Sequence, residues 1–113
     1  MKPSKFRLMC LLASCFPAAA LADGALHTWN VECAKCHGAS GDGRTKEGLK
    51  IRAKDYTDPK VQSAFTDTGL LKNLLLGVNA PNGDVRMPSY KDKMTVVEAK
   101  EMIALIRSFN GSK

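Results

Sequence analysis

Two cysteines and a histidine form the most chemically specific pattern in this sequence, Cys33-Ala34-Lys35-Cys36-His37. Two thiols three positions apart, followed at once by an imidazole, are typical of the attachment site of a c-type haem. Thiols one helical turn apart can each reach a vinyl group on the same edge of the porphyrin, and the next imidazole can bind the iron. The pattern therefore predicts one covalently bound haem c, with Cys33 and Cys36 as anchors and His37 as proximal ligand of the iron.

A Cys-x-x-Cys pair has two other common functions. It can form half of a zinc site, but zinc needs further ligands, and the only other histidine, His27, has no partner nearby. It can also be the redox centre of a dithiol oxidoreductase, which usually has a βαβ context that this chain lacks. The dithiol function remains the alternative outside haem chemistry.

Met87 is the candidate for the sixth ligand of the iron. It precedes Pro88 in a stretch without helical periodicity. A thioether is a soft ligand suited to haem iron, and a Met/His pair raises the reduction potential. Met94 and Met102 are competitors, but Met102 falls on the apolar face of a predicted helix and Met94 just before that helix begins. We expect both competitors to pack in the core.

The N-terminus has the parts of a bacterial signal peptide. A basic start is followed by an apolar run over residues 8–20, which is too short to span a membrane permanently. Ala20-Leu21-Ala22 then fits the small-x-small pattern of a signal peptidase site, so we expect residues 1–22 to be removed. The basic residues of this start are Lys2, Lys5 and Arg7.

A lipoprotein box, Leu12-Ala13-Ser14-Cys15, is an alternative in the same region, and Cys15 would then carry a lipid anchor. Both interpretations predict export to the periplasm, and without lipidation we expect no stable membrane insertion. Residues 23–113 form one small domain, and removing the signal peptide lowers the formal net charge from +6 to +3. The basic composition therefore gives no reason to expect nucleic-acid binding.

The mature region predicts an all-α domain without a convincing strand. Four helix starts are signalled by capping residues, and the last has a Thr95/Glu98 capping box. Residues 38–48 and 78–88 are predicted loops, whereas residues 49–57 show no clear period. The helix starts are expected at Asp23, at Asp58-Pro59, at Thr66 and at Thr95. The first helix should bury Ala25, Leu26, Trp29 and Cys33, and the last Ala99, Met102, Leu105, Ile106 and Phe109.

Over essentially the whole mature region, the chain resembles the short bacterial class I cytochromes c. The resemblance rests on Trp29 before the haem motif, the segment from Asp55 to Pro59, the leucine-rich helix that ends at Gly77, Met87-Pro88-Ser89-Tyr90 and the amphipathic last helix. It implies that the first and last helices cross around one haem, with Cys33 and Cys36 as thioether anchors, and His37 and Met87 as axial ligands.

With both axial positions filled, the iron has no open place for a substrate, so we expect an electron carrier and no enzyme. Its redox protein partners would be a quinol-oxidising complex or a dehydrogenase as donor, and an oxidase or reductase as acceptor. We expect a monomer. Alternatives are an electron-entry subunit of one periplasmic oxidoreductase, or a ligand-binding or peroxidatic haem protein with a labile methionine. Lys35, Lys91 and Lys93 are candidates for steering an acidic partner, or are ordinary solvated lysines.

Overall fold

The computed structural model describes residues 24–112, so the expected signal peptide, Cys15 and the Asp23 cap lie outside the described residues. The first described element is a helix that changes its winding. Residues 24–28 are α-helical, Trp29–Cys33 form the π-helical turn η2, and Ala34–His37 form α2. A π-helical turn is rare and is often found at functional sites. Here it lies directly before the second cysteine and the histidine of the haem motif.

Three further helices follow, and each begins at a side-chain cap. Thr45, Asp58 and Thr66 accept hydrogen bonds from backbone N–H groups in the first turns of their helices, which the ladder of a helix leaves unpaired. The caps at Asp58-Pro59 and Thr66 confirm the predicted starts. The helices are α3 (Lys46–Ile51), α4 (Pro59–Ala64) and α5 (Asp67–Leu76), which ends at Gly77.

Two short segments differ from the sequence-based prediction. Residues 46–51 are helical, whereas the sequence predicts a loop that runs into a stretch without period. Val78–Asn79 (β1) and Val85–Met87 (β2) pair as an antiparallel hairpin, where the sequence predicts only a loop. Both strands are too short to give a recognisable pattern, although Asn82-Gly83 between them is a typical hairpin turn.

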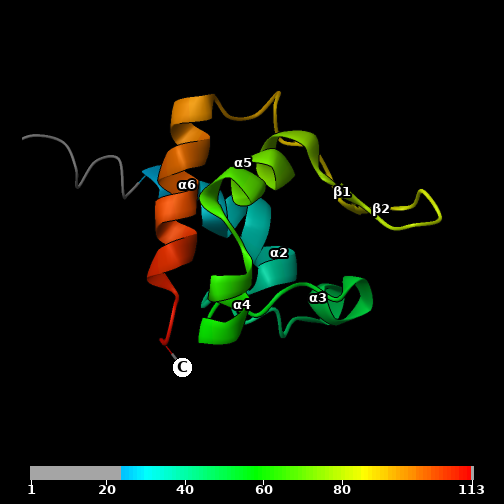
Figure 1. Ribbon diagram of the computed structural model, residues 1–113, viewed down its shortest axis with the longest axis horizontal. Coiled ribbons are helices and arrows are strands. Elements are labelled where there is room, and N and C mark those ends of the chain that lie inside the picture. The colour runs from blue at the N-terminus through cyan, green and yellow to red at the C-terminus, as the bar shows by residue number, and fades with distance from the viewer. Residues whose placement is uncertain (1–23, 113) are drawn as a thin grey trace, which may run out of the picture.

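The last helix, α6 (Val96–Ser108), has the predicted capping box between Thr95 and Glu98. It buries Ala99, Met102 and Ile106 as expected, and also Ile103, whereas Phe109 lies beyond its end as the C-cap. The N-terminal helix packs beside it, since residues 24–28 and α6 line one groove. Figure 1 shows this helix, in blue, passing behind α6.

The core lies between the N-terminal helix, α5 and α6. Trp29 and Met102 are its largest fully buried side chains, and Met94 is buried in the same cluster. Leu26 was expected in this core but is 43% exposed, so the buried face of the first helix is narrower than predicted. In residues 24–112, no helix is long and apolar enough to cross a lipid bilayer.

Candidate haem site

The structure places the four predicted site residues around one pocket. Cys33 ends η2, Cys36 and His37 lie in α2, and Met87 ends β2, fifty positions further along the chain. All four line this pocket, the site pocket, together with Ile51, Arg86 and Tyr90. An adjoining pocket, the inner pocket, shares Cys33, His37 and Met87 and is closed by Tyr56, Leu70, Leu74 and Ile106. The two thiols, the imidazole and the thioether therefore line a pocket at the place where the apolar core reaches the surface.

The competing methionines lie elsewhere. Met94 is 6% and Met102 1% exposed, and both are members of the core cluster. They also line the groove between the N-terminal helix and α6, and neither lines the site pocket. Met87 is thus the methionine that the fold brings to Cys33, Cys36 and His37, while the competitors pack as their sequence positions predicted.

A tight glycine-containing loop holds the haem motif. The indole Nε1 of Trp29 donates a buried hydrogen bond of 3.0 Å to the carbonyl oxygen of Gly38, and Gly43 N donates to the carbonyl of His37. Gly48 packs so closely on the motif that a Cβ there would collide with the carbonyl oxygen of Cys36. Only glycine fits this close approach, which explains a glycine inside α3.

His37 has the surroundings of a metal-binding imidazole. Its Nδ1 atom is buried without a hydrogen-bond partner, an arrangement that is rare in native proteins. Its ring stacks on Tyr56, with centroids 5.1 Å apart and planes inclined by 18°, and Trp29 packs nearby. Burial is the largest influence on the His37 ring and lowers its pKa. The ring is therefore kept neutral, as a metal ligand must be.

The two thiols differ in their exposure. Both are free, Cys33 being buried and Cys36 half-buried. Burial, with the nearby Glu32 carboxylate and Cys36, raises the pKa of Cys33 to about 11. A thiol with such a pKa is protonated at neutral pH and is a poor nucleophile for disulfide exchange. This environment disfavours the dithiol oxidoreductase alternative.

The residues present fit a haem c. They offer one neutral imidazole and one thioether as ligands for the iron, and two thiols that can attach the porphyrin covalently, around an apolar pocket. A structural zinc site would need four ligands. Within the described residues, no group of three or more His, Cys, Asp or Glu is arranged to hold a metal ion.

Three uncharged polar residues line these pockets and were not among the predicted site residues. Tyr56 and Asn73 line the inner pocket, and Tyr90 lines the site pocket. Their signals in the sequence are indirect: Asn73 lies between Leu70 and Leu74 on one face of α5, and Tyr90 follows Met87 by three positions. Polar residues at such positions are common, so these signals do not single out a site.

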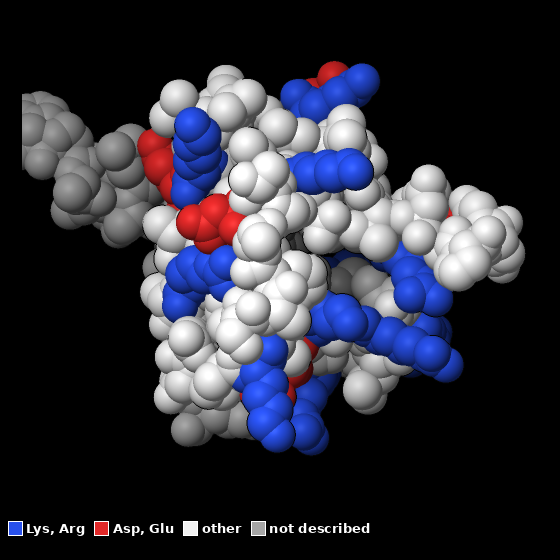
Figure 2. All heavy atoms as spheres, in the orientation of Figure 1, with Lys and Arg blue, Asp and Glu red and all other residues white. Residues whose placement is uncertain are grey.

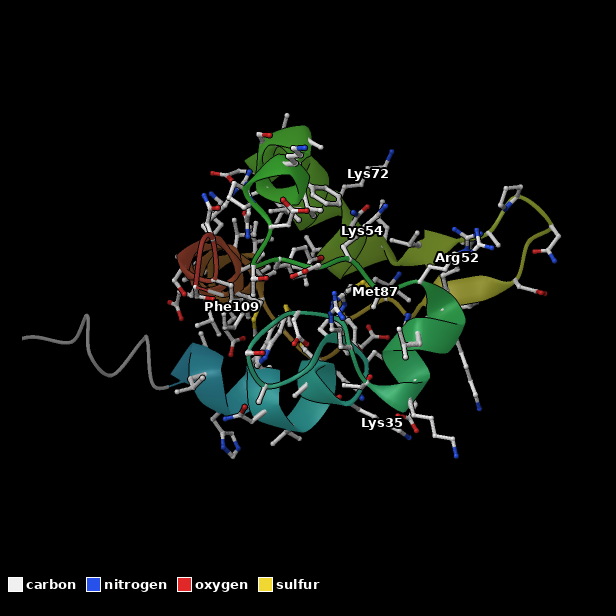
Figure 3. The ribbon with its side chains drawn as sticks, turned by 90° about the horizontal axis from the view of Figure 1, so that it is seen from below. Lys35, Arg52, Lys54, Lys72, Met87 and Phe109 are labelled. Atoms are coloured by element: carbon white, nitrogen blue, oxygen red, sulfur yellow. The ribbon has the colours of Figure 1, made fainter. Side chains whose placement is uncertain are left out.

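Basic side chains surround the opening of the site. In Figure 3, Lys35 comes from α2, Arg52 and Lys54 from the segment directly after α3, and Lys72 from α5, with the labelled Met87 between them in this view. Figure 2 shows Lys and Arg gathered over α3 and the side of the hairpin that faces it, with little negative charge between them. The surroundings of the site are therefore predominantly positive.

Comparisons with known proteins identify the family of this chain. The family model described as cytochrome c matches residues 21–110. The structure is similar to "KustC0563 c-type cytochrome" (TM-score 0.66, 24% identity, covering 76% of this chain and 96% of that chain). It is also similar to the structure of a Kustc0563 mutant (TM-score 0.64, 24% identity, 76% and 98%). No curated protein matches. With the fold, the family match shows that the chain belongs to the cytochrome c family, whose members bind a covalently attached haem c with its iron.

Proposed function

We propose that this protein is a one-electron carrier of the periplasm, with its haem anchored through Cys33 and Cys36 and its iron bound by His37 and Met87. The observation that carries the proposal is that these four side chains line one pocket. The bound haem supplies reversible one-electron chemistry at iron. His37 and Met87 would hold the iron from the protein, and the buried side chains of the adjoining pocket would shield part of the haem, so no position would be left for a substrate.

The proposed location rests on the N-terminal sequence. Cleavage after Ala22 would release the domain into the periplasm, whereas lipidation of Cys15 would tether it to a membrane surface. In both cases the redox protein partners would be a quinol-oxidising complex or dehydrogenase as donor and an oxidase or reductase as acceptor. Intact mass of the exported protein distinguishes an Asp23 start from a lipidated Cys15.

For docking we propose cations other than Lys35, Lys91 and Lys93, because none of these three lysines lines the site pocket or the groove that adjoins it. Lys93 is paired with Glu32, with 3.1 Å between Nζ and Oε2, so its charge is partly neutralised. A groove between α3 and the hairpin, the basic groove, is lined by three exposed cations and one exposed carboxylate, Asp84, together with Ile51 and Val85. It adjoins the site pocket, because Ile51 and Arg86 line both. Its cations are Lys50, Arg52 and Arg86.

The basic groove would steer an acidic partner to the haem edge. Long-range attraction of this kind raises association rates and weakens with added salt. Replacing Lys50, Arg52 and Arg86 by Glu should slow reduction by ferrocyanide, an anion, and speed reduction by a hexaammineruthenium cation. A matched control replaces Lys46, Lys60 and Lys100, three exposed lysines outside this groove, and should change both rates much less. Equal effects in both sets would contradict the docking assignment.

The ligand set is tested on the haem-loaded protein. Acidified organic solvent should fail to extract the haem, and Cys33→Ser or Cys36→Ser should leave at most one thioether. The oxidised protein should show the weak long-wavelength band of sulfur-to-iron ligation and the reduced form should bind carbon monoxide slowly. Met87→Ala should abolish the sulfur-to-iron band, lower the reduction potential of the haem and allow fast binding of carbon monoxide. Fast binding by the unmutated protein would instead favour a ligand-binding or peroxidatic function.

A further inference from the structure

The segment that carries Met87 is attached to two different parts of the fold. We call residues 87–90 the distal strap. On one side it is fixed to the end of α5, where Tyr90 N donates a 2.9 Å hydrogen bond to the carbonyl of Leu74. Ser89 Oγ donates a second one, of 2.5 Å, to the carbonyl of Leu75. These two bonds anchor the strap to the helix that forms one wall of the inner pocket.

On its other side the strap reaches the haem motif. The hydroxyl of Tyr90 donates a 3.2 Å hydrogen bond to the backbone carbonyl of Glu32, 58 positions away in the chain. Glu32 lies in η2 and directly precedes Cys33, the first expected anchor of the haem. Tyr90 is only 9% exposed and lines the site pocket next to Cys33 and Met87. One side chain therefore connects the distal ligand segment to the proximal motif across the mouth of the pocket.

We propose that Tyr90 is a positioning residue for Met87, whose hydroxyl keeps the distal strap closed against η2 and so keeps the thioether at the iron. The inference rests on the proposed function, since it requires Met87 to be the distal ligand. The argument is geometric. The bonds to α5 hold one edge of the strap, so the strap can carry Met87 away from the pocket by hinging away from η2. That motion breaks the bond from Tyr90 to Glu32.

The neighbouring ion pair contributes less to this closure. Lys93 Nζ lies 3.1 Å from Glu32 Oε2 and 5.9 Å from the centre of the Tyr90 ring. Its side chain is 59% exposed and that of Glu32 30% exposed, and ion pairs in such positions contribute little because solvent screens them. The hydrogen bond from the Tyr90 hydroxyl to Glu32 is partly buried, so water competes less for its donor and acceptor.

The test uses haem-loaded Tyr90→Phe, which removes only the hydroxyl and leaves the ring to pack. Cyanide is the probe, because it enters the oxidised protein only after Met87 leaves. Loss of one hydrogen bond that is present in the closed state alone should raise the cyanide-binding rate roughly 2- to 10-fold. The sulfur-to-iron band should weaken in parallel. Lys93→Gln should change the rate by less than about two-fold.

A control separates positioning from general loss of stability. Thr66→Ala removes the cap of α5, a bond from Gly69 N at the end of the helix opposite to Leu74 and Leu75. It should lower the thermal unfolding temperature at least as much as Tyr90→Phe does, yet leave the cyanide-binding rate unchanged. If both variants accelerate cyanide binding equally, Tyr90 is merely structural and the proposal is overturned.

Two further outcomes are decisive. In the first, Tyr90→Phe binds cyanide at the same rate as the unmutated protein, while Met87→Ala binds it faster. This result overturns the inference and leaves the proposed function intact. If Met87→Ala binds cyanide no faster than the unmutated protein, Met87 is not the limiting ligand and both fail. Amide exchange at Tyr90 N tests the α5 side of the strap. It should stay slow in both the unmutated protein and Tyr90→Phe, because hinging away from η2 leaves the bond to Leu74 intact, and fast exchange in the unmutated protein would overturn the proposal.

Discussion

Trp29 and Gly38 are joined by a buried hydrogen bond of 3.0 Å from the indole nitrogen to the carbonyl oxygen. Because Gly38 directly follows His37, this bond closes the backbone around the whole haem motif. Gly38 has a φ of +82°, so its carbonyl is turned out of the helix toward the indole. Trp29 is thus more than the core aromatic that the sequence predicts: it fixes the exit of the chain from the motif.

Trp29→Phe should destabilise the protein by about 2–4 kcal/mol, because the Gly38 carbonyl loses its donor and the smaller ring leaves a gap. Denaturant unfolding with constant m-values measures the change. Phe109→Leu is the matched control, since the Phe109 ring packs on Trp29 with centroids 4.9 Å apart without making this bond, and it should cost less. A loss below about 1 kcal/mol in Trp29→Phe would contradict the role of the bond.

Gly77→Ala should displace the end of β2. Gly77 has a φ of +78°, and a Cβ there would lie 2.6 Å from the carbonyl oxygen of Met87. Both strain and contact oppose the substitution, so we expect a loss of about 2 kcal/mol or more and a weaker sulfur-to-iron band in the haem-loaded protein.

Gly83→Ala is the control for this prediction. Gly83 also has a positive φ, of +93°, but a Cβ there would meet nothing within 4 Å. It should cost about 1 kcal/mol from backbone strain alone and leave the band unchanged. If Gly77→Ala kept the full band as well, the close contact with Met87 would not restrict the ligand.

Local signals in the sequence were sufficient to predict most helix starts and to select the three residues of the haem motif. The Thr95/Glu98 box and the Asp58 cap act within one turn, so they can be recognised without knowledge of the fold. The haem motif is equally local. Met87 is different: its approach to His37 depends on α5 and the hairpin, and only its proline-flanked loop and the need for a sixth ligand indicated it.

Contacts between distant segments were not predictable in the same way. Tyr90 and Glu32 are 58 positions apart, and nothing in either neighbourhood indicates the other. The exposure of Leu26 was not predictable for a similar reason. Helical periodicity shows which face of a helix is apolar, but it does not show how much of that face the neighbouring helix covers. The helix over residues 46–51 and the two strands of the hairpin are very short. Segments of this length show too few residues for a helical or alternating pattern to be recognised in the sequence.

The contacts of Arg107 with distant residues could not be predicted from the sequence either, and they lead to a further prediction. Its guanidinium donates to Gln62 Oε1 and to the carbonyls of Gln62 and Phe65, while Nε pairs with Asp67 at 3.0 Å. Arg107→Lys cannot reproduce this fork, so we expect a loss of about 2–3 kcal/mol in denaturant unfolding. Arg44→Lys, outside this network, should stay within about 0.5 kcal/mol. Equal effects would show that the fork does not hold α6 to α4.

The last prediction concerns alkaline pH and Tyr56. Burial raises the pKa of Tyr56 to about 12, with a smaller contribution from the charge of Cys33, which disappears once that sulfur is a thioether. The unfolded chain loses the proton near pH 10, whereas the folded protein keeps it. The stabilisation from Tyr56 is therefore complete below about pH 10 and is lost as the pH rises toward 12, by up to about 1.4 kcal/mol per pH unit.

This prediction is measured by the difference between the unmutated protein and Tyr56→Phe, because lysines titrate in the same range. Between about pH 10 and 12 the unfolding free energy of the unmutated protein should fall more steeply than that of Tyr56→Phe. In Tyr90→Phe, Tyr56 is the only tyrosine left, and its phenolate absorbance should rise near pH 12 as long as the protein stays folded. Titration near pH 10 in the folded Tyr90→Phe protein would mean that Tyr56 is open to water, and its ring could not then be closed against His37 as the 5.1 Å stacking requires.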